Sequence, residues 1–204
     1  MAKKARVTAR AGLASAAHDI LKFLASHHVP ACVIGGLAVQ RWGEPRATQD
    51  VDVTLLAPFG QEAASIDRLL SRYRPRDAGA RRFALERSVL KLRAPNDVPI
   101  DVSLGALPFE IEVLDRASPW RLSRVVELVV CSVEDLLIYK LVAARPRDLL
   151  DVAGIVRLRW RTLDLARVRA YTRELGDLLE APDLLQPFEE ALRKARREAT
   201  RLKP

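Results

Sequence analysis

The sequence predicts an α+β (α/β) fold in which a strand-rich first part is followed by a helical second part. Short apolar or alternating runs of strand length recur up to residue 131, whereas helical periodicity dominates from residue 132 onward. The 49% apolar content of the 204 residues is ordinary for a globular protein and is enough to form a core. We therefore expect a core over residues 1–131 and a C-terminal helical region over residues 132–204.

In the first part, the spacing of apolar residues alternates between the helical and the strand period. Apolar residues three and four apart predict helices, and short runs bounded by Pro, Gly or Asn-Asp predict strands. The expected elements are a helix over 11–28, a strand over 31–34, a helix over 37–42, a strand over 50–56, a helix over 61–73 and strands over 88–93, 100–104 and 125–131.

The second part opens with two helix-start signals. Ser132 followed three residues later by Asp135 has the form of a capping box and predicts a helix through Leu141. Pro146 suits the first turn of a helix that runs through Leu158. The remainder is helical by periodicity and rich in Arg.

Charge gives a first indication of partners. The chain has 34 Lys and Arg against 26 Asp and Glu, a net charge of +8. Such a balance is typical of a protein that meets a polyanion such as nucleic acid or a nucleotide. An Arg-rich composition without such a partner explains the charge equally well, since Arg far outnumbers Lys.

Several classes of protein and site are disfavoured. No run approaches the roughly 20 apolar residues that span a bilayer, and no apolar leader follows the basic N-terminus, so we expect a cytoplasmic protein without a membrane partner. Cys32 and Cys131 lie apart in apolar runs, without the clustered thiolates or imidazoles of a structural zinc site.

Two carboxylates on one strand are the first candidate for chemistry. Asp50 and Asp52 are two residues apart, so both side chains point to one face while Val51 and Val53 point to the other. Like charges on one face repel each other, and a hard divalent cation with oxygen ligands compensates them naturally. A solvated strand face is the common alternative for such a pattern.

Asp101 repeats this pattern on a later strand. It alternates with Ile100 and Val102, so three carboxylates converge if the two strands are neighbours. Asp97 and Glu110 compete for the third position, but Asp97 falls in a turn and Glu110 follows Pro108. Three such groups suit Mg²⁺ held against a triphosphate, and a pair of ions would stabilise the attacking and leaving oxygens of an in-line displacement.

Gly35 and Gly36 lie between a predicted strand and a predicted helix. Glycines there let backbone N–H groups approach a phosphate, and a helix N-terminus favours anions. A Gly-Gly pair alone is usually a turn. The ordered set is more specific, because Asp50 follows Gly36 by 14 residues and a third acidic residue lies on a later strand.

This set resembles the DNA polymerase β-like nucleotidyltransferase superfamily, which has Gly-Gly or Gly-Ser, a short helix and then D-x-D on a strand. The fuller pattern, with Ala38 after the glycines and Arg46 and Thr48 before Asp50, is similar to the AbiEii/AbiGii and MenT-type toxin nucleotidyltransferases. A second block supports the likeness over about residues 15–158: Lys140-x-x-Ala, Arg145, and Arg147-Asp148-x-x-Asp151.

The resemblance implies a nucleotidyltransferase core built on a mixed twisted sheet flanked by helices. It implies that Asp50, Asp52 and Asp101 are the catalytic and metal-binding residues, with Mg²⁺ or Mn²⁺ as cofactor and a nucleoside triphosphate as substrate. Asp101 would also act as the base. The implied nucleotide-binding residues are Gly35, Gly36, Arg46, Thr48, Lys140 and Asp148.

Structural readings of the second block stay open. Lys140 on an apolar helix face can extend its amine to the surface. Asp148 and Asp151 suit the start of a helix, where the macrodipole favours carboxylates, and Arg147 with Asp151 has the spacing of a surface ion pair.

The activity implied is transfer of a nucleoside monophosphate to a hydroxyl acceptor. RNA of the tRNA type is the first expectation for the acceptor, with the protein as the toxin of a toxin–antitoxin pair and an antitoxin as partner. The net charge and the basic stretch from Arg193 to Arg197 favour it, although that stretch also suits a solvated helix face. A small-molecule, aminoglycoside-type nucleotidyltransferase and a nucleotide-binding interaction module remain alternatives.

Overall fold

The computed structural model describes residues 2–201, and for residues 2–10 it describes the backbone alone. The first residue of the expected core and the last three of the expected helical region lie outside this range. The chain divides into two compact units. The first contains the residues up to Leu37 together with Ala47–Cys131, and the second contains Ala38–Arg46 together with the residues from Ser132 on.

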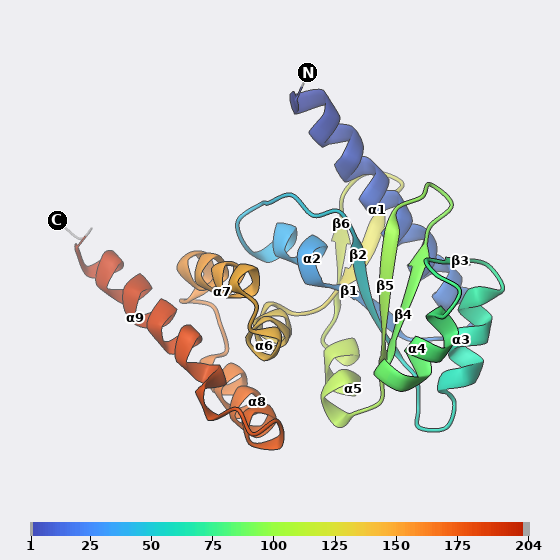
Figure 1. The fold of residues 1–204 in the computed structure, drawn as a ribbon. Coiled ribbons are helices and arrows are strands. Elements are labelled where there is room, and N and C mark those ends of the chain that lie inside the picture. The colour runs from blue at the N-terminus through green and yellow to red at the C-terminus, as the bar shows by residue number, and fades with distance from the viewer. Residues whose placement is uncertain (1, 202–204) are drawn as a thin grey trace. The chain divides into compact units, whose positions relative to one another are not determined.

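The first unit is built around a seven-stranded mixed sheet with the strand order β3-β4-β5-β2-β1-β7-β6 (Figure 1). The β2–β5 and β1–β7 pairs are parallel, and the other neighbours are antiparallel. The strands are β1 Ala31–Ile34, β2 Val51–Leu56, β3 Arg74–Pro75, β4 Val89–Arg93, β5 Pro99–Gly105, β6 Ser118–Arg121 and β7 Glu127–Val130.

Alternation along the two central strands explains their burial. On β2, Val51, Val53 and Leu55 are fully buried, and on β5 the apolar partners Ile100 and Val102 are too. Each such side chain contributes about 1.5–3 kcal/mol when it leaves water. The same alternation leaves the intervening polar residues Asp52 and Asp101 half-buried on the other face.

Helices complete both units. In the first unit α1 packs along β1 and β7, where His18 hydrogen-bonds the Glu127 carbonyl at 2.9 Å, and α4 lies against β4. The helices of the first unit are α1 Ala2–Ser26, α3 Glu62–Leu70, α4 Ala80–Arg87 and α5 Pro108–Asp115. Helix α2, Gly35–Trp42, contributes to both units. The helices of the second unit are α6 Val133–Ala143, α7 Pro146–Arg159, α8 Leu165–Leu178, the 3₁₀ turn η1 Pro182–Leu185 and α9 Gln186–Arg201.

The α+β (α/β) fold class with a mixed sheet is confirmed, and so are the two helix starts in the second part. Ser132 Oγ accepts the Asp135 N–H at 3.1 Å, and Pro146 occupies the first turn of α7. The strand expected from Val125 begins only at Glu127, because Ser123 Oγ accepts the N–H groups of Val125 and Val126 in a turn.

Other boundaries also differ from expectation, and the structure adds β3, α4, α5 and β6, which the periodicity did not predict. Helix α2 begins at Gly35 rather than after the glycines, and α3 ends at Leu70 rather than Tyr73. Tyr73 is instead buried in the following loop, where its hydroxyl donates to Asp19 at 2.7 Å. This tertiary contact draws the chain away from the helix path that the local periodicity favours.

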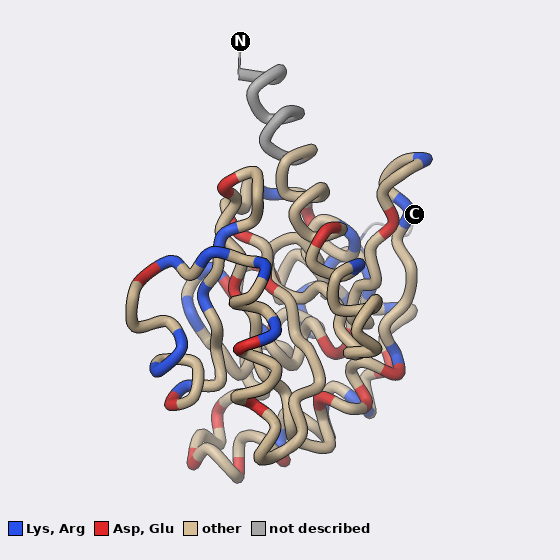
Figure 2. The backbone as a smooth tube through the Cα atoms, turned by 90° about the vertical axis from the view of Figure 1, so that its right-hand side faces the viewer, with Lys and Arg blue, Asp and Glu red and all other residues tan. Residues whose placement is uncertain are grey.

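No described helix combines the length and the hydropathy that a membrane span requires. In the part of the chain that Figure 2 draws in colour, basic and acidic residues are interspersed.

Candidate active site

Three carboxylates lie on or directly before two adjacent central strands of the first unit. Asp52 on β2 and Asp101 on β5 are register partners on adjacent parallel strands. Asp50 directly precedes β2, and its Oδ1 accepts a hydrogen bond from Thr48 Oγ1 at 3.0 Å. We call Asp50, Asp52 and Asp101 the carboxylate trio. All three are half-buried, so each is partly removed from water but still open to a ligand.

The two competitors for the third acidic position have other partners. Asp97 lies in an exposed turn and forms ion pairs with Arg74 and Arg93. Glu110 lies in the first turn of α5 and accepts the Leu107 N–H at 2.9 Å. Neither is in register with Asp52.

Cations compensate Asp101 on the side of β4. Arg76 Nη2 lies 2.6 Å from Asp101 Oδ1, and Lys91 is its register partner. Burial raises the pKa of the Asp101 carboxyl above its ordinary value, Arg76 and Lys91 act in the opposite direction, and the nearby charge of Asp50 raises it further. Asp101 Oδ1 is buried and is already paired with the Arg76 guanidinium, although the two groups are not in hydrogen-bond geometry.

The glycines are pressed against the second carboxylate of the trio. Gly35 has φ +62°, and a Cβ at this position would lie 1.9 Å from Asp52 Oδ2. The next amide, Gly36 N–H, donates to the same oxygen at 3.2 Å. The N-terminus of α2 therefore already binds an anionic oxygen, as expected for the positive end of a helix.

This close approach gives a testable prediction for Gly35→Ala. We expect nucleotidyl transfer to fall at least tenfold, because the methyl group must displace the Asp52 carboxylate. The unfolding free energy should fall by about 1–3 kcal/mol from the left-handed backbone strain. Gly60→Ala is the matched control, because Gly60 also has a positive φ, +81°, but has nothing within 4 Å of its would-be Cβ. Equal transfer rates for the two variants, measured alongside urea unfolding, would contradict the role given to this contact.

The second block forms a buried ion network in the second unit. Lys140 Nζ lies 2.6 Å from Asp148 Oδ1 and 3.0 Å from Asp151 Oδ2, and all three side chains are about 3–6% exposed. Arg46 binds both oxygens of Asp151, at 2.6 and 2.7 Å, and Arg145 Nε donates to Asp148 at 2.6 Å. We call these five residues the buried ion network, because Lys140, Asp148 and Asp151 at its centre are buried, whereas Arg145 is largely exposed.

The network changes the interpretation of its members. Lys140 does not extend to the surface, and Asp151 is buried rather than part of a surface pair, so these two structural readings are wrong. Burial alone would raise the pKa of Asp148 and Asp151, but hydrogen bonds from Lys140, Arg145 and Arg46 outweigh it and hold both values below the ordinary range. The charges of Lys140, Asp148 and Arg46 therefore already have partners within the second unit.

The trio fits a hard cation by the chemistry of its donors. Carboxylate oxygens are the ligands that Mg²⁺ prefers, and Mg²⁺ takes only one or two of them together with substrate phosphates and water. Within the part of the chain that the structure describes, no group of three or more His, Cys, Asp and Glu side chains is placed to hold a metal ion.

Sequence comparison identifies the family of the chain. The family described as nucleotidyl transferase AbiEii toxin, type IV TA system, matches residues 24–203. The chain belongs to this AbiEii family. It is therefore a nucleotidyltransferase, and the predicted resemblance to the AbiEii toxins is confirmed. No curated protein matches the chain.

Two solved structures are similar to this AbiEii-family chain. The antibiotic-resistance factor ANT(2'')-Ia aligns with a TM-score of 0.53 and 13% identity, over 82% of this chain and 93% of that chain. An antigenic nucleotidyltransferase-like protein from Paracoccidioides brasiliensis aligns with a TM-score of 0.49 and 16% identity, over 87% of this chain and 92% of that chain. At such identities the first likeness supports the fold alone.

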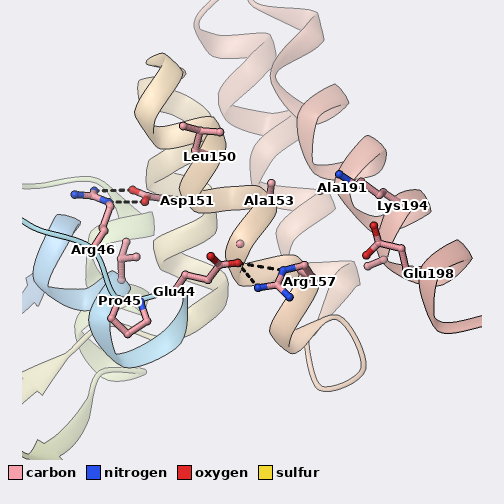
Figure 3. A pocket seen from close by; sticks show the side chains of 13 residues that line it. Glu44, Pro45, Arg46, Leu150, Asp151, Ala153, Arg157, Ala191, Lys194 and Glu198 are labelled. Atoms are coloured by element: carbon pink, nitrogen blue, oxygen red, sulfur yellow. Dashed lines mark hydrogen bonds and ion pairs between the residues drawn. The ribbon is translucent and has the colours of Figure 1, made fainter. Parts of the chain in front are cut away.

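A pocket of about 390 Å³ lies in the second unit of the AbiEii-family chain (Figure 3). The small residues Ala153, Gly154 and Ala191 line part of the pocket. Glu44 and Arg157, which also line it, form an ion pair. All of its lining residues belong to the second unit, and none is a member of the carboxylate trio.

One charged neighbour of the carboxylate trio, Arg76, was not predicted from the sequence. Arg76 follows β3, a two-residue strand too short to recognise from periodicity, and no motif marks it. Lys91 was detectable, because strand alternation already places it on the polar face of β4. The side chain of Arg76 next to Asp101 is a consequence of tertiary folding.

Proposed function

We propose that this AbiEii-family enzyme transfers a nucleoside monophosphate from a nucleoside triphosphate to a hydroxyl group of RNA, of the tRNA type. We further propose that it acts as the toxin of a toxin–antitoxin pair. The single observation that carries the catalytic part is the register of Asp52 with Asp101, with Asp50 and the Gly35–Gly36 amides beside them.

Each residue of the first unit has a distinct proposed task. An acceptor hydroxyl oxygen attacks the α-phosphorus, the bond to the bridging α–β oxygen breaks, and pyrophosphate leaves with the electron pair. Asp101 accepts the proton of the attacking hydroxyl, a task that its half-buried position in register with Asp52 suits. Thr48 holds Asp50 in place. The Gly36 amide, which donates to Asp52 in the free protein, exchanges this contact for the triphosphate and binds its β- and γ-phosphates together with the Gly35 amide.

We propose that Asp50, Asp52 and Asp101 hold Mg²⁺ or Mn²⁺. When bound, the cation neutralises charge that develops on the transferring phosphoryl group and on the leaving pyrophosphate. Without it, the three carboxylates would repel a triphosphate, so the donor set and the substrate both require a compensating positive charge.

Lys140, Asp148 and Arg46 receive a supporting task in this proposal. Their charges satisfy one another inside the second unit, and exchanging these buried contacts for a phosphate would cost several kcal/mol in desolvated, unpaired charge. We propose that they position α6 and α7 rather than contact the triphosphate.

The acceptor and the partner follow from charge and family. A net charge of +8 favours a polyanionic acceptor over a cationic small molecule, since a cationic acceptor would need an acidic cleft. The type IV toxin family supports an antitoxin protein as partner.

A labelling series tests the proposal. Purified protein, Mg²⁺ and each α-labelled nucleoside triphosphate are incubated with total tRNA and, separately, with an aminoglycoside panel, beside an Asp50→Asn/Asp52→Asn control. We expect label on tRNA that is absent from the control. Label only on an aminoglycoside would contradict the RNA acceptor, and triphosphate binding without transfer to any acceptor would favour an interaction module.

A further inference from the structure

The second unit carries two tryptophans that arginines flank. Arg41 lies 4.2 Å from the ring centre of Trp42, and Arg159 lies 6.0 Å from it. Arg161 lies 4.7 Å from the ring centre of Trp160, and Arg196 of α9 lies 5.9 Å from it. We call these six residues the tryptophan–arginine surface. Arg41-Trp42 and Arg159-Trp160-Arg161 are consecutive in the sequence, but these two segments and Arg196 are distant in the chain and are brought together by the packing of the second unit.

This surface is held in place by packed backbone. A Cβ on Gly43 would lie 2.8 Å from Ile155, so the end of α2 is in close contact with α7. Arg159 Nε donates to the Trp42 carbonyl at 3.3 Å, which ties the two tryptophan-bearing segments together. Helix α9 packs along α7 in the same unit (Figure 1). The surface is therefore preorganised, which lowers the entropy lost on binding.

Three arginines of the surface differ from several other arginines of the second unit in lacking a carboxylate partner within the part of the chain that the structure describes. Elsewhere in the same unit arginines bind carboxylates: Arg167 pairs with Asp135 and Arg169 with Glu189. Among the described residues, by contrast, Arg159, Arg161 and Arg196 have no carboxylate partner. All three are exposed. These guanidinium groups are available to an anionic ligand.

The helix dipole alone does not explain this composition. Cations at the C-terminus of α7 are favoured by about 0.3–1 kcal/mol each. That effect accounts for Arg159 and Arg161 but not for two half-buried indole rings beside them. Aromatic faces next to guanidinium groups are the combination on which unpaired bases stack while the backbone phosphates are neutralised.

We propose that the tryptophan–arginine surface binds unpaired bases and adjacent phosphates of a single-stranded RNA segment. The bases stack on Trp42 and Trp160, and the arginines contact the phosphates. This inference rests on the proposed RNA acceptor and specifies where the second unit contacts it. An acidic protein partner is the competing occupant, but hydrogen-bonded or ionic contacts to carboxylates would leave the indole faces unexplained.

Equilibrium binding of fluorescently labelled tRNA, without nucleoside triphosphate, tests this proposal. We expect Trp42→Ala and Trp160→Ala each to weaken binding about 5- to 100-fold, the range measured for loss of one stacked base. Trp160→Phe should restore most of the affinity, because it keeps a ring. Trp120→Ala is the matched control, since Trp120 is also half-buried but lies on β6 of the first unit.

Salt dependence separates phosphate contacts from a structural effect. The double variant Arg159→Gln/Arg161→Gln should reduce the slope of log K against log[salt] by about 1.4, since each single-strand phosphate contact contributes about 0.7. Thermal melting of each variant verifies folding, and a variant that does not fold is replaced by its Phe or Lys counterpart.

The outcomes distinguish this inference from the proposed function. Unchanged tRNA affinity in folded Trp42→Ala and Trp160→Ala proteins overturns the inference, while label transfer to tRNA by the parent still supports the function. If the Trp42→Ala and Trp160→Ala proteins no longer bind an acidic protein partner but keep their tRNA affinity, the inference is also overturned, and the surface is assigned to that protein. Weakened tRNA binding by these variants, with Trp120→Ala unchanged, supports the inference even where the parent transfers no nucleotide.

Discussion

Asp52→Asn is expected to abolish nucleotidyl transfer while leaving the fold intact. The amide keeps the size of the carboxylate, and its oxygen can still accept the Gly36 N–H that Asp52 accepts at 3.2 Å. It removes the negative charge that, with Asp101 in register on β5, makes the pair of strands a site for a cation and a triphosphate. Loss of one such electrostatic group costs about 10²–10³-fold in rate.

An exposed Asp in the same unit provides the control for this substitution. Asp67→Asn removes the same charge from α3, where Asp67 pairs with Arg81 at the surface. We expect its single-turnover transfer rate to equal that of the parent. Parental transfer by folded Asp52→Asn would show that Asp52 is not part of the catalytic machinery.

Lys140→Met is expected to cause the largest loss of stability, about 3 kcal/mol. The substitution keeps most of the side-chain volume but leaves Asp148 and Asp151 buried without their shared ammonium. Removing one partner of a buried ion pair costs about 3–5 kcal/mol. The lower value applies because Arg46 and Arg145 remain. For a chain of this length, the melting temperature should fall by about 6–12 °C.

Lys22→Met, on the exposed side of α1, is the control and should change the unfolding free energy by less than about 0.5 kcal/mol. Equal unfolding free energies for the two variants in urea would contradict the energetic role of the buried ion network.

The network also predicts how stability depends on pH. The pKa of the Asp148 and Asp151 carboxyls is lower in the folded chain than the ordinary 3.8 of the unfolded chain. Their contribution is therefore complete above about pH 4 and is lost as the pH falls through the folded-state values. In Lys140→Met this acid-dependent loss should be smaller, because part of the depression of the pKa values disappears with the ammonium.

The two central strands of the first unit, β2 and β5, were predictable because they depend on local alternation. Asp52 and Asp101 occupy the half-buried positions of β2 and β5, and the apolar neighbours Val51 and Ile100 are buried, as the sequence indicates. The sequence does not show whether these two strands are neighbours. In the structure they are, with Asp52 opposite Asp101.

Long-range contacts account for what the sequence did not predict. Strand β3 has two residues and no period, so Arg76, which follows it, carried no signal. Whether Lys140 is buried or exposed depends on whether Asp148 and Asp151 face inward. The packing of α6 against α7 determines this. Residues 38–46 belong to the second unit although they are distant from it in the sequence, and local periodicity cannot predict such a long-range contact.

Cation binding is the most direct test of the carboxylate trio. Mn²⁺ would be titrated into the parent protein and into Asp50→Asn/Asp52→Asn, each with a non-hydrolysable nucleoside triphosphate, and bound Mn²⁺ would be measured by electron paramagnetic resonance. We predict bound Mn²⁺ in the parent at levels that the double variant and a protein-free triphosphate control do not reach. Equal binding by the two folded proteins would contradict the assignment of the catalytic centre to these carboxylates.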